Sequence, residues 1–294
     1  MMIFRNILVI ISLMYIGSSQ ELEDYSHCVV EGENLKCRKR ETRNEHAISI
    51  ACVGDSITAG SHSSGGNHPY PQQLQILLDQ AYGNDTYSVT NLGSSGSTML
   101  KRSDKTYWNQ SVYETLTQNT WDIVVVMLGT NDAKDTSSGG PDNWQHDCGS
   151  ISSPSLSNCS FANDYADMIS VIRTLGKTKT ISPKIYITVP ISLLEQGVYG
   201  MNQTVINSMY PKLIPMIAKE NNVELITQVY QGFGGEGDWK TDLPVNGCTL
   251  NDSHSPWDLK FCKYWCDKQS CDQCHPNDQG YTHMAIDFQE GIGL

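Results

Sequence analysis

Apolar runs alternate with amphipathic segments along most of the chain after residue 46. Five of these runs predict β-strands, at Ile48–Val53, Tyr87–Leu92, Trp121–Leu128, Lys184–Val189 and Val223–Val229. The run Trp121–Leu128 is almost continuously apolar and rich in β-branched residues. Such a strand is expected where helices cover both faces of a parallel sheet.

Between these runs, apolar residues recur at helical spacing. Two helical faces are marked by Tyr70, Leu74, Leu77, Leu78 and Ala81, and by Phe161, Tyr165, Met168, Ile169, Ile172 and Leu175. The stretch Val205–Lys219 predicts a kinked helix or two short helices, because Pro211 and Pro215 each lack a backbone donor. A final helix is expected to run through Phe288, capped by Asn277 or Asp278. The alternation predicts an α/β domain with a mostly parallel five-stranded sheet, whose active site lies at the carboxyl ends of the strands.

The remaining segments suggest how the chain is organised. Residues 20–46 are polar and contain Cys28 and Cys37, so they are expected to form an extension closed by a local disulfide, ahead of a domain at 47–294. Two long loops, 133–160 and the cysteine-rich insertion 231–274, each follow a predicted strand. Because long loops in compact domains usually serve function, we expect both at the same functional rim of the sheet.

The first nineteen residues have the pattern of a signal peptide. Arg5 precedes an apolar run from Ile7 to Ile16, and small residues follow at 17–19. The run is shorter than the roughly 20 residues that span a bilayer, although a retained anchor is the alternative. Five glycosylation sequons follow, at Asn84, Asn109, Asn158, Asn202 and Asn251. We therefore expect a protein that is secreted or lies in a secretory-pathway lumen such as the lysosome, without stable membrane insertion after cleavage.

Composition narrows the class of protein. Hydrophobic residues make up 39% of the 294 residues, which excludes a disordered tail or a collagen-like repeat. The formal net charge of −12 argues against a nucleic-acid partner, because binding to phosphate backbones depends on clustered Lys and Arg. A small-molecule or carbohydrate ester substrate without charge is compatible with this balance.

Candidate chemistry begins at the loop after the first predicted strand, where Ser56 follows Gly54 and Asp55. A serine hydroxyl attacks an ester only when a base accepts its proton and an acid orients that base. His275 lies three residues after Asp272 and just before the last helix, so one turn presents both groups. The other histidines of the domain, His62, His68 and His254 among them, lack a carboxylate at that spacing.

A tetrahedral intermediate also needs hydrogen-bond donors for its oxyanion. Two further strand ends carry suitable groups, Asn91–Gly96 and Gly129–Asp132. We expect the backbone N–H groups of Ser56 and Gly96 and the side-chain amide of Asn131 to form the oxyanion hole.

Four sequence blocks in this order resemble the GDSL or SGNH hydrolase family: GDSIT at Gly54–Thr58, N-x-x-x-S-G at Asn91–Gly96, GTND at Gly129–Asp132 and D-x-x-H-P at Asp272–Pro276. The resemblance covers residues 48–288 and implies Ser56 as nucleophile, His275 as base and Asp272 as its orienting acid. Gly96 and Asn131 are implied as oxyanion donors. The resemblance also implies a three-layer αβα, flavodoxin-like fold and hydrolysis of acyl esters with no cofactor and no metal.

The chain departs from many family members at Gln273, where they carry glycine, and in the insertion before it. A degenerate descendant that only binds glycans is the alternative to an active hydrolase. An α/β-hydrolase is disfavoured because no G-x-S-x-G elbow occurs, and a phosphate loop is disfavoured because Val171 occupies a position that needs glycine.

Ten cysteines require an explanation in a chain that is large enough to fold without staples. The spacing of Cys262, Cys266, Cys271 and Cys274 beside a histidine is compatible with zinc, but disulfides are favoured in an exported chain. Cys148–Cys159 is a second plausible local pair. Cys52, inside the first strand, is expected to stay reduced, which leaves one more unpaired thiol.

Substrate preference depends on the two long loops, which contain Trp144, Trp239, Trp257 and Trp265. These rings are predicted to be buried in the loops rather than exposed to stack on sugars. Neither loop has an apolar helix suited to a lipase lid. We therefore predict a short-chain esterase, with acetyl esters of carbohydrate as the main hypothesis and a lipid acylhydrolase of the lysophospholipase type as the alternative.

Overall fold

The computed structural model describes residues 25–31, 34–39, 47–64, 68–178, 180–235, 262–266 and 271–294. The chain divides into two compact units, Met1–Glu45 and His46–Leu294. In the first unit, β1 (Tyr25–Glu31) pairs with β2 (Asn34–Lys39) in antiparallel register, and Cys28 lies opposite Cys37. The side chains of these strands lie outside the described part of the structure, as does the expected signal peptide at residues 1–19.

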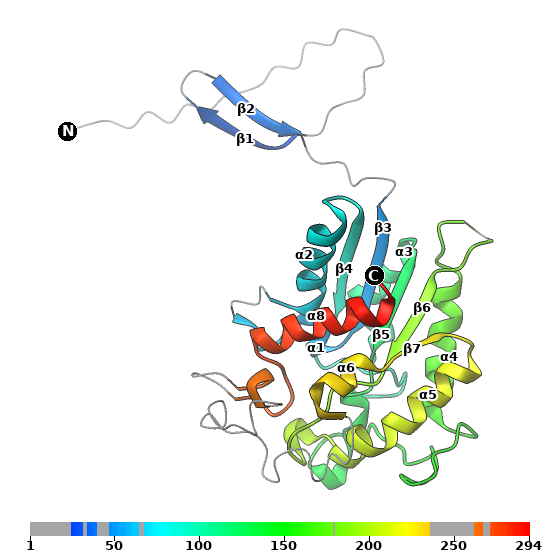
Figure 1. Cartoon of the computed structure of the whole chain (residues 1–294). Coiled ribbons are helices and arrows are strands. Elements are labelled where there is room, and N and C mark those ends of the chain that lie inside the picture. Colours follow the sequence, from blue (N-terminus) through cyan, green and yellow to red (C-terminus); the bar gives the residue numbers. More distant parts are fainter. Residues whose placement is uncertain are drawn as a thin grey trace. The chain divides into compact units, whose positions relative to one another are not determined.

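The second unit is built on a five-stranded parallel sheet with the order β4-β3-β5-β6-β7 (Figure 1). Its strands are β3 (Ile48–Gly54), β4 (Tyr87–Gly93), β5 (Ile123–Met127), β6 (Lys184–Thr188) and β7 (Glu224–Ile226). The predicted strands are thus confirmed, although the last is shorter than expected. Because β3, the first strand of this sheet in sequence order, lies inside the sheet, the strand order reverses beside it, and ligands bind at such switch points in open α/β sheets.

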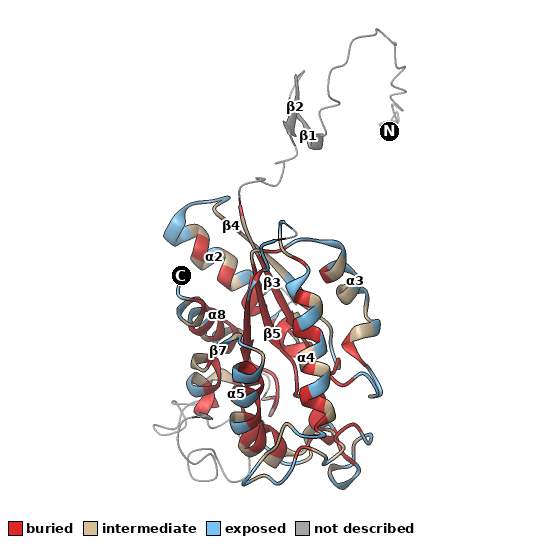
Figure 2. Ribbon diagram, turned by 90° about the vertical axis from the view of Figure 1, so that its right-hand side faces the viewer, coloured by how far each residue is buried: buried red, intermediate tan, exposed pale blue. Residues whose placement is uncertain are grey.

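Helices cover both faces of the sheet. In β3, the side chains of Ile50 and Cys52 pack with α2 (Tyr70–Tyr82) and α8 (Asp278–Ile292). The alternate side chains, Ala51 and Val53, pack on the opposite face with α3 (Ser111–Gln118), α4 (Ser160–Arg173) and α5 (Tyr210–Glu220). Figure 2 shows the result, with the central strands β3 and β5 largely buried and the helices buried on the sides that face the sheet. The fold is therefore the three-layer α/β sandwich that the alternating pattern predicts.

Helix boundaries follow local chemistry. The Asn277 side chain accepts a hydrogen bond from the Gly280 N–H at 2.9 Å and caps α8, as one of the two predicted candidates. The segment that was predicted to be kinked forms a π-helical turn, Val205–Met209, followed by α5. Pro211 lies in the first turn of α5 and Pro215 lies inside that helix. Three of the described α-helices were not predicted: α1 (Ser56–Ala59), α3 and α6 (Gln228–Tyr230). Helix α6 replaces the end of the last expected strand.

The described loops at the carboxyl edge are packed segments. Cys148 and Cys159 form a disulfide at the start of α4, and Trp144 and Trp265 are buried, as predicted. Trp239 and Trp257 lie outside the described residues. The remaining short helical turns in the domain are η2 (Tyr107–Asn109), η3 (Asn131–Ala133), η4 (Thr136–Ser138), η5 (Val198–Gly200), η7 (Gln231–Gly235) and η10 (Cys262–Tyr264). Across the residues that the structure describes, none of the helices is both long and apolar enough to cross a bilayer.

Candidate active site

The turn after β3 positions Ser56 at the carboxyl edge of the sheet. Asp55 precedes α1 and accepts a hydrogen bond from the Ile57 N–H at 2.9 Å, which caps this short helix. Gly93, at the end of neighbouring β4, lets α1 approach closely, because a Cβ there would lie 2.2 Å from the backbone nitrogen of Ala59. Backbone atoms cannot yield as a flexible side chain can, so the position of the serine depends on this glycine.

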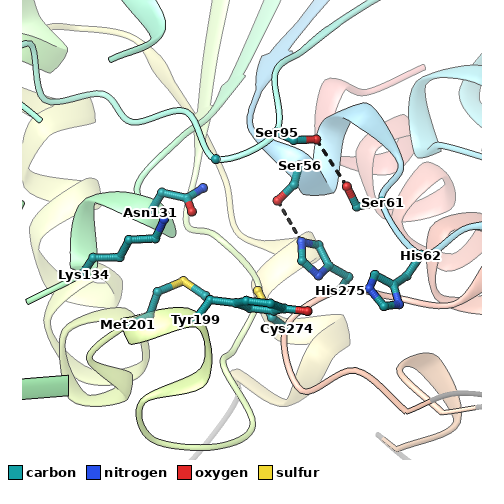
Figure 3. Close-up of a pocket in the computed structure, with 11 residues that line it drawn as sticks. Ser56, Ser61, His62, Ser95, Asn131, Lys134, Tyr199, Met201, Cys274 and His275 are labelled. Carbon is teal, nitrogen blue, oxygen red and sulfur yellow. Dashed lines mark hydrogen bonds between the residues drawn. The ribbon is translucent and has the colours of Figure 1, made fainter. Parts of the chain in front are cut away.

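Ser56, His275 and Asp272 lie in one hydrogen-bonded row (Figure 3). His275 Nε2 lies 2.8 Å from Ser56 Oγ, and His275 Nδ1 lies 3.1 Å from Asp272 Oδ2. The residues are 9%, 8% and 8% exposed, so the row is largely shielded from water and still reachable at the serine. With Nδ1–H donating to the carboxylate, Nε2 is left as the acceptor for the serine proton, which is the arrangement that a nucleophilic serine needs.

The carboxylate of Asp272 accepts four hydrogen bonds and has one further contact, with His62. Oδ1 accepts the N–H groups of Cys274 and His275, each at 2.7 Å. Oδ2 accepts from His275 and from the hydroxyl of Tyr199 at 2.8 Å, and it also lies 3.0 Å from His62 Nε2. Burial alone would raise the pKa of Asp272, but the hydrogen bond and charge of His275, with the backbone and Tyr199 bonds, hold this pKa below its ordinary value. The acid is therefore ionised at neutral pH.

One contact of a histidine lies beyond what sequence spacing can indicate. No carboxylate lies three residues before His62, yet in the folded chain its imidazole contacts the same oxygen of Asp272 as His275 does. The contact forms because the fold brings the loop after α1 beside the turn before α8.

The three residues predicted to supply oxyanion donors lie around one cavity at the Ser56 hydroxyl. Ser56, Gly96 and Asn131 all line one cavity, and in Figure 3 the amide of Asn131 points across it toward the Ser56 hydroxyl. Asn131 also donates to the carbonyl of Ser97 at 3.3 Å, which orients the amide. Gly96 has a φ of +79°, a left-handed conformation that glycine adopts without strain.

Two further acidic residues of the motif blocks hold the loops around the site. Asp132 is fully buried and accepts the N–H groups of Met99 and Leu100 at 3.0 and 2.7 Å, which secures the segment after Gly96. Burial raises the pKa of Asp132 to about 7, and the two N–H bonds oppose this rise. Burial likewise raises the pKa of Asp55 to about 6. Their contacts give both residues a structural role in placing the neighbouring backbone.

The cavity beside Ser56 has a volume of about 270 Å³. Its lining combines the predicted residues with several that the sequence did not single out for the site: Ser61, His62, Ser95, Lys134, Tyr199, Met201 and Cys274. These residues come from five separate segments of the chain, and no local spacing relates the segments to one another. Tyr199 had a weak signal, since it lies in the turn Gly197-Val198-Tyr199-Gly200 after a predicted strand, but its contact with Asp272 depends on the fold.

Among the described residues, two groups of side chains have the composition of a metal site. His62, Asp272 and His275 present ligand atoms within 4.8 Å of one another, and Asp147 lies near Cys148 and Cys159. In the second group both sulfur atoms are joined in a disulfide. In the first, the N···O distances of 3.0 and 3.1 Å are those of hydrogen bonds, and a metal there would displace the proton that fixes the tautomer of His275.

Three of the cysteines near the site are disulfide-bonded, which argues against a zinc site there. Cys266 is joined to Cys271, directly before Asp272, and Cys262 is also disulfide-bonded. Within the described part of the chain Cys52 and Cys274 are free and buried, in line with the prediction that two thiols stay reduced. The remaining cysteines, at 28, 37 and 248, lie where no side chain is described.

Comparison with known proteins gives agreement on family and fold. A family model described as the GDSL-like lipase/acylhydrolase family matches residues 52–283. An acetylxylan esterase from Xylanibacter ruminicola is 29% identical over 255 residues, which make up 82% of this chain and 42% of the relative. This chain therefore spans less than half the length of that relative.

Solved structures with low sequence identity share the fold. A crystal structure of an acetyl xylan esterase matches with a TM-score of 0.52 at 20% identity, over 83% of this chain and all of the other. An aryl esterase from M. smegmatis matches with a TM-score of 0.51 at 16% identity, over 84% of this chain and 98% of the other. At such identities the likeness is one of architecture.

Proposed function

Because the chain belongs to the GDSL-like lipase/acylhydrolase family, we propose that it is a carboxylic ester hydrolase with Ser56 as its nucleophile. The observation that carries the proposal is the hydrogen-bonded row from Ser56 through His275 to Asp272, with distances of 2.8 and 3.1 Å. This geometry supplies the three groups that acyl transfer to serine requires.

In the proposed reaction, His275 Nε2 takes the proton of the Ser56 hydroxyl as Oγ attacks the carbonyl carbon of the ester. The oxygen of the tetrahedral intermediate accepts hydrogen bonds from the N–H groups of Ser56 and Gly96 and from the Asn131 amide. The imidazolium gives its proton to the departing alcohol oxygen, which leaves an acyl-serine. Water then repeats the sequence with His275 as base, which releases the acid and restores the hydroxyl. Asp272 stays ionised throughout and stabilises the imidazolium.

We propose short acyl groups on a carbohydrate as the substrate, with acetyl as the main candidate. Two observations support this choice: the acetylxylan esterase relative and the small volume of the cavity, about 270 Å³. A drug-sized ligand fills about 300–1,000 Å³, so this cavity suits an acetyl group with part of its alcohol better than a long acyl chain.

A chain-length series tests the substrate class most directly. Purified protein is assayed with p-nitrophenyl acetate, butyrate and octanoate and with acetylated xylo-oligosaccharide, and kcat/KM is expected to be highest for acetate. The Ser56→Ala variant should lose turnover while its circular dichroism is unchanged, and Ser170→Ala, an exposed serine on α4, serves as the matched control. A preference for octanoate would favour the lipid acylhydrolase, and glycan affinity without turnover would favour the binding-only alternative.

We further propose that residues 1–19 are cleaved as a signal peptide, that 20–46 form an extension and that 47–294 form the hydrolase domain with its cysteine-rich insertion at 231–274. The disulfides Cys148–Cys159 and Cys266–Cys271 support an oxidising compartment, outside the cell or in a secretory lumen. Amino-terminal sequencing of protein from a eukaryotic secretion host tests the cleavage, which is expected near residue 19.

The described sequons differ in their freedom to carry a glycan. Asn84, Asn109 and Asn158 are exposed, whereas the Asn202 amide donates to Asp135 Oδ2 at 2.8 Å. Because N-glycosylation uses that amide nitrogen, we propose glycans at the three exposed sites and none at Asn202. Glycopeptide mass spectrometry of the secreted protein tests this, and full occupancy at Asn202 would contradict it.

A further inference from the structure

The catalytic acid is contacted by two side chains that no motif contains. His62 Nε2 and the Tyr199 hydroxyl lie 3.0 and 2.8 Å from Asp272 Oδ2, the same oxygen that faces His275. The backbone N–H bonds to Oδ1 fix one oxygen of the carboxylate. The contacts of His62 and Tyr199 fix the other, so the plane of the carboxylate is held from both sides.

Both residues adopt an unusual backbone conformation. The φ angles of His62 and Tyr199 are +66° and +52°, in the left-handed region that residues other than glycine rarely occupy. Burial does not explain the strain, because the His62 side chain is 42% exposed and Tyr199 is 55% exposed. Strained residues at such positions cluster at functional sites, and here the strain directs both side chains to one oxygen atom.

The loops that carry the two residues are anchored near them. Before His62, the carbonyl of Ser61 accepts a 2.6 Å hydrogen bond from the Tyr281 hydroxyl on α8. Around Tyr199, the Gly200 N–H donates to the Gly197 carbonyl at 2.9 Å, and the Gly200 carbonyl accepts from the Asp135 N–H at 3.2 Å. Such anchoring gives the exposed side chains a fixed base from which to hold the carboxylate.

The same two rings flank the imidazole of His275 (Figure 3). The ring planes of His62 and His275 are parallel to within 6°, with centroids 5.2 Å apart. The Tyr199 ring meets His275 at 65°, with centroids 5.5 Å apart. His275 is therefore restricted by rings as well as by its hydrogen bond to Asp272.

From these contacts we infer that His62 and Tyr199 are positioning residues: Tyr199 donates a hydrogen bond to Asp272 Oδ2, the imidazole of His62 contacts the same oxygen, and together they hold the carboxylate and the His275 imidazole in line with Ser56. This inference rests on the proposed function, because it assigns the two residues a role in the same reaction. Both residues also line the cavity at Ser56, and their effect on the base passes through Asp272.

Three variants separate the contribution of each donor. Tyr199→Phe removes only the hydroxyl, His62→Gly removes the imidazole and suits the left-handed backbone, and His62→Gln keeps an N–H donor. Each of the first two is expected to lower kcat for p-nitrophenyl acetate about tenfold with KM changed less than about twofold, as expected for loss of a hydrogen bond to a charged group. His62→Gln should recover most of the loss. Because both residues contact one oxygen, the double variant should lose more than the product of the single losses.

Matched controls exclude a general effect of the substitutions. Tyr82→Phe changes another exposed tyrosine, and His146→Gly changes another exposed histidine with a left-handed φ of +55°. Neither Tyr82 nor His146 lines the cavity at Ser56, so both variants should keep wild-type kcat.

A spectroscopic readout reports on the hydrogen bond without turnover. The proton on His275 Nδ1 should give a low-field ¹H NMR resonance, assigned by its absence in His275→Gln, and this resonance should shift or broaden in Tyr199→Phe and His62→Gly. Wild-type kcat and an unchanged resonance in both variants would overturn the inference. If Ser56→Ala is inactive while these variants match wild type, the positioning role fails and the proposed hydrolase stands. If Ser56→Ala is fully active, the proposed function itself fails.

Discussion

Replacing Asp272 with asparagine tests the orientation of the base more sharply than deleting the residue. Four groups donate hydrogen bonds to the carboxylate, two to Oδ1 and two to Oδ2, and His62 Nε2 lies 3.0 Å from Oδ2. An amide has one oxygen and one NH₂ group, so in either orientation donors face donors. If the NH₂ group faces His275, Nδ1 must accept, and the ring proton moves to Nε2, where it points at Ser56 and prevents proton transfer.

The magnitude follows from this change of tautomer. We expect kcat to fall by about 10³–10⁴, the loss typical of an aspartate-to-asparagine change in a serine triad, which corresponds to about 4–5.5 kcal/mol of transition-state stabilisation. Stability should fall as well, by about 3 kcal/mol at neutral pH, because a buried, hydrogen-bonded charge loses its match. The pKa of Asp272 lies below its unfolded value of about 3.8, so this contribution is complete at pH well above 4 and diminishes as the pH falls.

The assay measures kcat for p-nitrophenyl acetate at 25 °C and the free energy of unfolding in urea at pH 7 and pH 4. Asp167→Asn, which changes an exposed carboxylate on α4, is the control for the substitution itself. The stability gap between Asp272→Asn and wild type should be smaller at pH 4. A folded Asp272→Asn protein that keeps more than a tenth of wild-type kcat would refute the assignment of Asp272 as the orienting acid.

Three further predictions follow from the described structure. Gly93→Ala should lower the free energy of unfolding by at least about 2 kcal/mol in urea melts and also reduce kcat, because its Cβ would lie 2.2 Å from the Ala59 nitrogen and displace α1; unchanged stability would contradict the close packing. Burial and the charge of Glu290 raise the pKa of Asp287 to about 7, so wild type should lose stability as the pH rises through 7, whereas Asp287→Asn should not. At pH 8 the free energy of unfolding of Asp287→Asn should exceed that of wild type by about 2 kcal/mol, half of the full value that the pKa shift gives, because the carboxyl group is partly hydrated. An equally large difference between variant and wild type at pH 5 would refute this prediction. Thiol titration should find no reactive thiol in the native protein, because Cys52 and Cys274 are buried and burial raises the pKa of the Cys52 thiol to about 12. After denaturation without reductant it should find two thiols, those of Cys52 and Cys274. Four or more thiols would contradict the disulfide assignment.

The sequence predicts the sheet well because its signals are local and strong. The β5 run is buried on both faces and therefore apolar throughout, so its composition alone identifies a central strand. The Asn277 cap is equally local, since its side chain bonds a backbone N–H three residues later. Helix α3 was not predicted because only Leu116 in it is buried, which leaves little apolar periodicity to detect. Helix α6 was not predicted because its apolar residues continue the pattern of the strand before it.

The residues of the candidate site also fall into those that local sequence motifs predict and those that depend on the fold. Ser56, Asn131 and His275 lie in short blocks at strand ends or beside a helix, and the parallel sheet brings such ends together. His62 and Tyr199 reach Asp272 across 210 and 73 positions of sequence, and each is aimed by a left-handed backbone angle that its residue type does not predict. Sequence patterns report elements and motifs, whereas these two contacts depend on how two loops are anchored.

The most direct test of the central claim is covalent labelling of the nucleophile. Purified protein is incubated with a fluorophosphonate, which reacts with activated serines, and the adduct is located by peptide mass spectrometry. We predict one adduct per chain on Ser56, lost in Ser56→Ala and greatly slowed in His275→Gln. An adduct on another residue, or full esterase activity in protein that carries the label on Ser56, would contradict the account.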